Sequence, residues 1–307
     1  MKYAAIDINF DSLNYAYGFP RGYKDPSFFG IAERFMDIAD RYNFKYSIYV
    51  IGKDLKSARN CERVKEWSSR GHEIGNHSWS HVMNLSSMDK KSIYNEVKMA
   101  HDKIAKTIGS EPKGFISPFW STSPRLIGVL EQLSYLYDTS YFPSWVMFPM
   151  VIKNLYNHLG SDRLLSIMSN QNNFLSYLFG KRNLHSITTK SAKKGKPSGI
   201  TILPIPTNKY RIACWHTPVF TTGWKLHEKL LKSCLKDIEA FYYLIHPADL
   251  LDKKDLDKTK KLFFERVNVP LNTKINYLEK SIETILDSGR RIVTMRELAE
   301  KCRNGTD

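Results

Sequence analysis

Three of the chain's nine histidines, His72, His77 and His81, gather within residues 71–85. His77 and His81 are four residues apart, which on one helical turn would place both imidazoles on the same face. Two imidazole nitrogens and one carboxylate form a known three-ligand set for catalytic zinc, with a fourth position open for water. The alternative is a pair of hydrogen-bonded structural histidines. The spacing alone does not decide, although we expect His72 to be structural.

Two other residues of suitable chemistry follow predicted strands. Asp11 comes directly after an apolar run at 3–10, and His246 ends the run at 242–246. In parallel α/β folds, sites form at the carboxyl ends of the strands. We therefore expect Asp11 to meet the His77–His81 pair around one divalent cation, with His246 at the same end.

Asp138 and His216 are further candidates, each with a structural alternative. Asp138 lies in a short run at 137–140, and His216 ends an apolar run at 210–216. A strand-end carboxylate is as readily a hydrogen-bond acceptor as a site residue, and a histidine after an apolar run is often packed in the core. We keep both as candidate site residues.

Strand-like and helix-like patterns alternate along the chain, which predicts parallel strands with helices outside. We expect strands at 3–10, 45–52, 72–77, 113–117, 137–140, 199–205, 210–216, 242–246 and 291–295, with helices between most of them. Gly71 and Gly109 are positioned to end helices, and Ser86 or Ser87 to begin one. The length favours a barrel of seven or eight units in a single domain, residues 1–307, over an open sheet.

Residues 141–199 break this rhythm with an aromatic patch, an amphipathic stretch and the basic loop "KSAKKGKPSG". We interpret them as an irregular insertion over one mouth of the barrel. The basic loop is either a solvated linker or a lid that docks on an anionic membrane face or a lipid-linked substrate.

The chain has 307 residues and a formal charge of +15. Such an excess suits an anionic partner. We do not expect nucleic acid, because no RNP-type or zinc-finger pattern is present. The four scattered cysteines indicate reduced, structural thiols. The first residues resemble a strand more than a signal peptide, and the longest apolar run, 145–152, is too short to span a membrane. These features predict a cytoplasmic protein.

Several segments, in order, resemble the polysaccharide deacetylase family (NodB homology, carbohydrate esterase 4). "GHEIGNHSWSH" is similar to its His-Ser/Thr-x-x-His motif, and "INFDSLNYAYG" to the first motif of an Asp-x-Asp branch. "KGFISPFWSTSP", "YLYDTSYFPS", "YYLIHPADLLD" and "RRIVTMRELAE" resemble later motifs, so that the similarity covers about residues 3–300. The resemblance implies a distorted (β/α)7 barrel.

The same resemblance implies roles for individual residues. Asp11, His77 and His81 would hold Zn²⁺ or another divalent metal, and His246 would be the general acid. Pro118 and Phe119 would form part of the groove wall. Trp120 and His216 are further candidates for substrate contact.

Two positions depart from the family pattern. Asn9 occupies the position of the catalytic base, and an amide cannot take up a proton. Ile116 replaces the arginine that normally pairs with that base, so that a whole ion pair is missing, which avoids an unpaired buried charge. In a second register Asp11 is the base and Ser12 takes the metal position; we prefer the first because the aromatic loop after Asp11 matches the Asp-x-Asp branch. Asp7, on the same strand face as Asn9, would need a water relay to act as a base.

Two functions follow as hypotheses. The first is a metal-dependent deacetylase that removes an N-acyl group, expected to be N-acetyl, from an amino sugar in surface polysaccharide biosynthesis. Its predicted location favours a nucleotide-linked or lipid-linked sugar, and the chain could work at the inner membrane face. The second is a catalytically inactive homologue that binds metal and carbohydrate.

Overall fold

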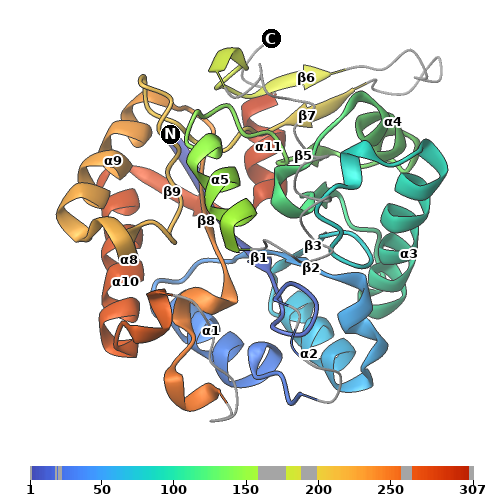
Figure 1. Ribbon diagram of the computed structural model, residues 1–307, viewed down its shortest axis with the longest axis horizontal. Helices are drawn as coiled ribbons and strands as arrows, with labels where there is room; N and C mark the ends of the chain where they lie inside the picture. Colours follow the sequence, from blue (N-terminus) through green and yellow to red (C-terminus); the bar gives the residue numbers. More distant parts are fainter. Residues whose placement is uncertain are drawn as a thin grey trace.

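The computed structural model describes residues 2–17, 19, 23–157, 178–187, 199–256 and 265–303. Strands occupy the centre of the molecule and helices surround them (Figure 1). The described sheet is curled into part of a barrel, which confirms the predicted distorted (β/α)7 architecture. The described helices include none that is both long enough and apolar enough to cross a membrane.

The sheet follows the order β6-β7-β5-β4-β3-β2-β1-β8, and β9 also pairs with β1. All pairs are parallel except β6 with β7. The strands are β1 (Lys2–Phe10), β2 (Ser47–Val50), β3 (Glu73–Asn76), β4 (Gly114–Phe115), β5 (Tyr137–Asp138), β6 (His185–Ile187), β7 (Ile200–Ile202), β8 (Phe241–Ile245) and β9 (Arg290–Val293). The described helices of more than one turn are α1 (Ala32–Arg41), α2 (Ala58–Ser69), α3 (Lys90–Ile108), α4 (Pro124–Gln132), α5 (Met147–Asn157), α9 (Trp224–Asp237), α10 (Leu271–Asp287) and α11 (Met295–Arg303).

The alternation of β1 separates an apolar face from a polar one. Ile6, Ile8 and Phe10 pack in a core cluster with residues of α1, α2 and α10. Their neighbours Asp7 and Asn9 are also buried but belong to the opposite, interior face of the strand. The interior of the barrel therefore carries polar side chains that lead along β1 towards Asp11.

The predicted strand at 210–216 is wrong. That segment makes only an isolated bridge, between Thr207 and Ala213. Two features stop regular pairing: Pro204 and Pro206 lack the N–H group that a ladder needs, and Arg211 has a φ of 57° in a turn. The segment still contacts β8 through the bond from His216 N to the Leu244 carbonyl (2.9 Å).

Most predicted helix ends are confirmed, with one correction. Gly109 ends α3 with a φ of 77°, and Gly71 follows α2 with a φ of 87°. However, the N-cap of α3 is Asp89, whose carboxylate accepts from the N–H groups of Lys91 and Ser92. Neither Ser86 nor Ser87 is its cap, because both belong to a separate 3-10 turn.

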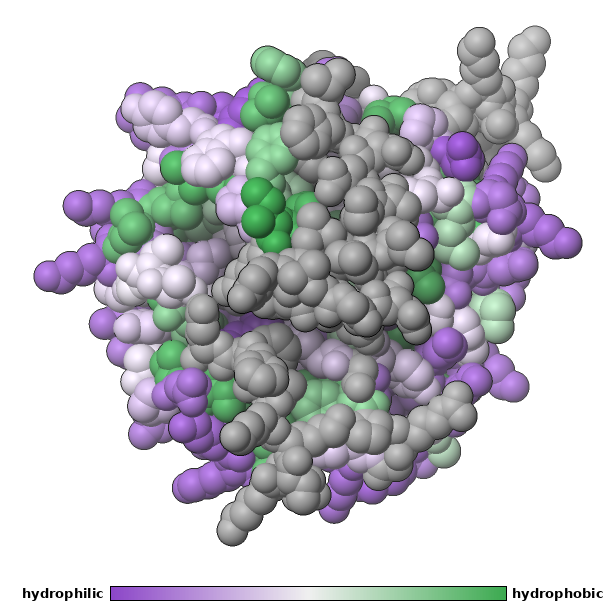
Figure 2. All heavy atoms as spheres, viewed as in Figure 1, coloured by the Kyte–Doolittle hydropathy of each residue, from purple (hydrophilic) through white to green (hydrophobic). Residues whose placement is uncertain are grey.

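The predicted insertion at 141–199 contains regular elements where it is described. It includes α5 and the antiparallel strand β6. Figure 2 shows apolar side chains over α5, where Ile152 is 67% exposed. The basic loop lies almost entirely outside the described residues.

Candidate metal centre

Three side chains from two separate loops converge as the sequence predicts. Asp11 follows β1, and His77 and His81 follow β3. The Asp11 Oδ1 atom lies 3.1 Å from His77 Nε2 and 3.2 Å from His81 Nε2. One ligand atom from each residue lies within 4.8 Å of the other two. The set is mostly buried but reachable, since the His77 side chain is 1% exposed, that of His81 11% and that of Asp11 15%.

The contacts of His77 indicate what this cluster binds. Its Nδ1 lies 2.8 Å from the Ile116 carbonyl oxygen, an atom that can only accept. Nδ1 therefore carries a proton and donates to this carbonyl, so that Nε2 is the ring nitrogen that faces the Asp11 carboxylate. A positive charge, on the ring or on a cation held between Nε2 and Oδ1, accounts for their 3.1 Å separation. A carbonyl that orients a histidine in this way is also typical of metal sites.

The charge on Asp11 fits the same interpretation. Burial by itself would raise the pKa of Asp11, but His81 and His77 outweigh burial and hold that pKa well below its usual range. Asp11 is therefore ionised at neutral pH. An anionic oxygen and two imidazole nitrogens are the ligand chemistry of a catalytic zinc site.

The histidine loop differs from the predicted helical turn. Residues 77–84 are irregular, and both Ser78 (φ 63°) and His81 (φ 56°) occupy the left-handed region that non-glycine residues rarely adopt. Asn76 Oδ1 accepts from Ser78 N (2.8 Å), and Ser78 Oγ accepts from His81 N (3.2 Å). These bonds hold a strained backbone in which both rings turn towards Asp11.

The comparisons with known proteins agree with this geometry. The profile of the family described as "Polysaccharide deacetylase" matches residues 21–137. A crystal structure of a putative polysaccharide deacetylase from Mycobacterium smegmatis superimposes with a TM-score of 0.60 at 15% identity, over 99% of this chain and 91% of that one. The chain is therefore similar to the polysaccharide deacetylase family in sequence over residues 21–137 and has the fold of a putative member.

Two further relatives bear on function. A chitin deacetylase from Pestalotiopsis sp. is 23% identical over 35% of this chain and 36% of its own length. A CE4 family pseudoenzyme from Bacillus anthracis has a TM-score of 0.52 at 12% identity, over 97% of this chain and 65% of that one. The first curated relatives are matched over only 30–42% of their own length.

The predicted general acid His246 has well-defined partners. Its Nδ1 lies 3.3 Å from Thr217 Oγ1 and 3.7 Å from Asp249 Oδ2, and its backbone N–H donates to Asp249 Oδ2 (2.8 Å). Arg266 donates in turn to Asp249 Oδ1 (2.6 Å). Burial alone would raise the pKa of Asp249, but Arg266 and His246 reverse that effect and hold the pKa far below normal. A fixed carboxylate and the Thr217 hydroxyl therefore orient His246.

Asp249 and Arg266 are functional candidates that the sequence analysis missed. A signal was present for Asp249, since an acidic residue three positions after His246 lies on the next turn of a short helix. Arg266 is distant in sequence and offers no such spacing. It also donates to the hydroxyl of Tyr17 (2.9 Å), in the aromatic loop after Asp11. Burial alone would lower the pKa of Arg266, but Tyr17 and Asp249, with a smaller effect from Asp11, raise it.

The predicted base position has no proton acceptor. Asn9 is 5% exposed and its Oδ1 has no hydrogen-bond partner. Ile116 lies fully buried in an apolar cluster. Only the backbone carbonyl of Ile116 contributes to the site, through His77, and a carbonyl is independent of the side chain. The loss of an arginine at this position therefore leaves the support of the metal cluster unchanged.

Asp7 lies deeper in the barrel than Asn9 on the same strand face. It is fully buried, and neither of its carboxylate oxygens has a hydrogen-bond partner. Burial, reinforced by the negative charge of Glu73, raises the pKa of Asp7 well above normal. Burial therefore favours the neutral acid form of Asp7, which cannot take up a proton as a base must.

Asp138 points away from the barrel interior. It pairs in register with Phe115 and Ile202, and both of these pack in a cluster with α3 and α4 residues. Its Oδ1 accepts from Ser140 Oγ (2.5 Å), and burial raises its pKa to about 7. These contacts support the strand-end alternative for Asp138.

The residues expected to contact substrate divide by exposure. Phe119 is half-buried with a φ of 54°, whereas Pro118 is buried and Trp120 packs against Phe142 and Trp215. His216 is fully buried, with Nδ1 3.0 Å from the Tyr243 hydroxyl, and burial lowers its pKa to about 4. Phe119 is the one of these four with substantial exposed surface.

Proposed function

We propose that the chain is a metal-dependent carbohydrate deacetylase that removes an N-acyl group, expected to be N-acetyl, from an amino sugar. The observation that carries this proposal is the convergence of Asp11, His77 and His81 in a chain similar to the polysaccharide deacetylase family. A chitin deacetylase and peptidoglycan N-acetylglucosamine deacetylases among its relatives support an amino-sugar substrate.

The proposed metal ligands are Asp11 Oδ1 and the two histidine Nε2 atoms, a donor set that favours zinc. When bound there, zinc supplies a Lewis acid that polarises the acyl carbonyl and activates water. Ile116 keeps the His77 ring in the tautomer that leaves Nε2 free. The chain's own contribution to this half of the site is a fixed, partly desolvated ligand set.

His246 would donate a proton to the leaving amine. Its Nδ1 faces Thr217 and Asp249, so that Nε2 is the atom left to hold the transferable proton. Asp249, itself paired with Arg266, fixes the position of His246 by accepting from its backbone N–H, as a general acid requires. The proposed site therefore has a residue suited to act as the general acid, whereas Asn9 cannot act as the general base.

The proposal is tested by acetate release from N-acetylglucosamine oligomers by the zinc-loaded chain. We expect slow hydrolysis, reduced about 10²–10⁴-fold in His246→Ala, the usual contribution of a general acid. His185→Ala, which changes a histidine remote from Asp11 in the sheet order, is the control and should retain full activity. No acetate release from any oligomer by the wild-type chain would contradict the proposal.

A second candidate function is metal and carbohydrate binding without turnover. The specific observation in its favour is the missing base and its missing arginine at Asn9 and Ile116. The fold of the B. anthracis protein shows that this architecture exists in a protein described as a pseudoenzyme. Activity that appears only in Asn9→Asp would favour this second function, whereas wild-type activity would favour the first.

Other parts of the expectation rest on composition. Surface polysaccharide biosynthesis, a nucleotide-linked or lipid-linked sugar, a cytoplasmic location and an anionic membrane surface stay predictions from the charge of +15 and the sequence. Acetate-release assays with a sugar nucleotide, with a lipid-linked amino sugar and with free oligomers would distinguish these substrate forms.

A further inference from the structure

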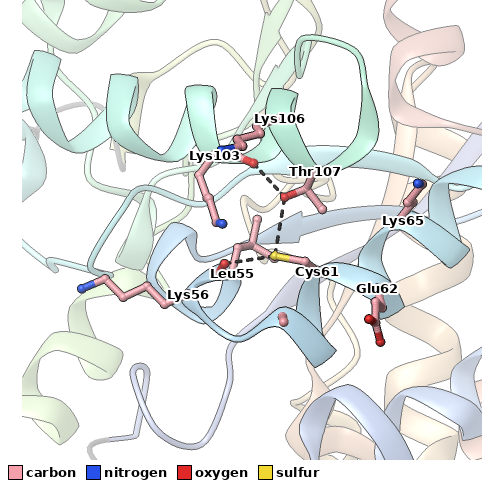
Figure 3. A pocket seen from close by; sticks show the side chains of 9 residues that line it. Leu55, Lys56, Cys61, Glu62, Lys65, Lys103, Lys106 and Thr107 are labelled. Atoms are coloured by element: carbon pink, nitrogen blue, oxygen red, sulfur yellow. Dashed lines mark hydrogen bonds between the residues drawn. The ribbon is translucent and has the colours of Figure 1, made fainter.

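A hollow lies on the outside of the barrel, away from Asp11, His77 and His81, between α2, α3 and the 3-10 turn Gly52–Lys56 (Figure 3). Its volume is about 370 Å³, which is within the range of small-molecule sites. Residues from three separate elements line it: Leu55, Lys56, Ala58, Cys61, Glu62, Lys65, Lys103, Lys106 and Thr107. No residue of the metal cluster or of the acid group contributes to it.

The lining is strongly basic. Four of its nine residues are lysines, and Glu62 is the one acid among them. No ion pair joins any of these four lysines to a residue that the structure describes. Helix-surface lysines elsewhere do find partners, as in Lys98 with Asp102 and Lys232 with Glu228. The lining therefore has a net positive charge, which favours an anionic ligand. Figure 3 shows Lys103 extending into the hollow, whereas Lys56 and Lys65 lie on opposite sides of it.

The floor of the pocket is small and neutral. Leu55 is fully buried, and the Cys61 thiol donates to the Leu55 carbonyl (3.0 Å). The Thr107 hydroxyl donates to the Lys103 carbonyl (2.8 Å). Figure 3 shows the Lys103 side chain reaching from α3 across the gap towards Leu55 and Lys56. Lys103 is partly buried, whereas the other three lysines are exposed.

One rim of the pocket touches the histidine loop. The ammonium group of Lys56 lies 5.6 Å from the ring centre of Trp79, which stands between His77 and His81. The turn that carries Lys56 is also bonded to that loop, through Gly52 N to the Ser78 carbonyl (2.9 Å). The pocket is thus a separate site that shares a wall with the support of the metal cluster.

We propose that this pocket binds a phosphate-bearing small molecule, with Lys103 and Lys106 from α3 and Lys56 and Lys65 from the facing elements contacting the phosphate oxygens. Lysine binds phosphate as a point charge, and several such charges around one hollow suit a diphosphate better than a single carboxylate. The neutral floor accommodates the uncharged part of the ligand. The inference does not depend on deacetylase activity.

The test is isothermal titration of the full-length, zinc-loaded chain with inorganic pyrophosphate. We expect binding that weakens with added salt. The variant Lys103→Met with Lys106→Met keeps the aliphatic stems and should weaken binding at least about tenfold, because a bond to a charged group contributes at least that factor. The matched control is Lys229→Met with Lys236→Met, which removes two charges from exposed positions of α9.

The outcomes distinguish a small phosphate compound in this pocket from a phosphate bound at the metal site and from a phospholipid headgroup. Weaker pyrophosphate binding by the α3 double variant, with unchanged binding by the α9 double variant, supports the proposal. Equal pyrophosphate binding by the two double variants overturns the proposal, because capture of pyrophosphate at the metal site would give that result. Absence of pyrophosphate binding by the wild-type chain also overturns it. Sedimentation with phosphatidylcholine vesicles containing phosphatidylglycerol is the second arm. Lysine-dependent vesicle binding without pyrophosphate binding would overturn the assignment to a small molecule. Circular dichroism melts verify that both pairs of variants fold.

Discussion

The two halves of the proposed acid–base machinery differ in how their charges are partnered. In the proposed acid group, Asp249 contacts both His246 and Arg266. In the proposed base region, Asp7 with Asn9 and Ile116, the described residues form no ion pair and offer no hydrogen-bond partner to the Asp7 carboxylate oxygens or to Asn9 Oδ1. Asp249 and Asp7 are both fully buried, so exposure does not explain the difference.

The comparison shows two ways of placing charge near the proposed site: Asp249 and Arg266 form a buried ion pair, whereas positions 9 and 116 carry two uncharged side chains. Removing one member of a buried ion pair leaves an uncompensated charge that costs several kcal/mol, whereas replacing both members can be nearly neutral. Asn9 and Ile116 correspond to the second case. Asp7 lies beside them as a buried carboxyl group without an ion pair among the described residues, and its pKa is raised because burial favours the neutral acid. Variants on each side of this contrast should therefore behave differently.

The largest effect is expected from breaking the pair in the acid group. Arg266→Met leaves the Asp249 carboxylate buried beside an uncharged side chain, and we expect a loss of about 3–5 kcal/mol in the free energy of unfolding at pH 7. Urea denaturation measures it. Arg70→Met, which breaks the exposed pair with Asp40, is the control and should cost less than about 1 kcal/mol.

The stability lost in Arg266→Met should also depend on pH. The pKa of folded Asp249 is depressed, so its stabilisation is fully present above the unfolded pKa of about 3.9 and is lost as the pH falls below it. The difference between wild type and Arg266→Met should therefore narrow below about pH 4. A difference that stays constant from pH 7 to pH 3 would contradict the proposed pair.

Next in size is the loss of metal. Asp11→Ala removes the carboxylate that lies against both histidines, and we expect zinc affinity to fall more than about 100-fold, since loss of an outer-shell partner alone typically costs 10–100-fold. Competition with a chromophoric chelator measures it. His185→Ala serves as the control, and unchanged affinity in Asp11→Ala would rule out the proposed ligand.

A smaller, pH-dependent gain in the free energy of unfolding is expected for Asp7→Asn. Folded Asp7 stays protonated while the unfolded chain ionises it above about pH 4, so wild-type stability falls with rising pH until the raised folded pKa is passed. Asp7→Asn cannot ionise. Its stability relative to wild type should grow by about 1.4 kcal/mol per pH unit across that range.

Urea denaturation of the chelator-treated chain between pH 4.5 and pH 7.5 measures the effect on Asp7→Asn. The exposed Asp37→Asn is its control and should run parallel to wild type. A parallel curve for Asp7→Asn as well would show that Asp7 is ionised in the folded chain and that burial does not keep it neutral.

The sequence predicts the barrel and the metal cluster because both depend on local patterns. Apolar runs of the right length indicate the strands, and Asp11, His77 and His81 each follow one of them. The failures have physical reasons. Pro204, Pro206 and the left-handed Arg211 prevent a strand where the apolar pattern is strand-like.

Other features depend on tertiary contacts that no short pattern carries. The backbone at His81 is left-handed because Ser78 and Asn76 fix it, which the four-residue spacing cannot indicate. Arg266 meets Asp249 across 17 positions, and in sequence it resembles any other cation of a basic chain. The inward or outward direction of Asp138 follows from register, which is set by its neighbours in the sheet.

The central claim is that one carboxylate and two imidazoles share a divalent cation. X-ray absorption at the zinc edge of the stoichiometrically loaded chain tests it most directly. We predict two imidazole nitrogens at about 2.0–2.1 Å and a carboxylate oxygen at about 2.0–2.2 Å, with one imidazole lost in His77→Ala. A sulfur scatterer at about 2.3 Å, or a spectrum that is the same in wild type and His77→Ala, would contradict the claim.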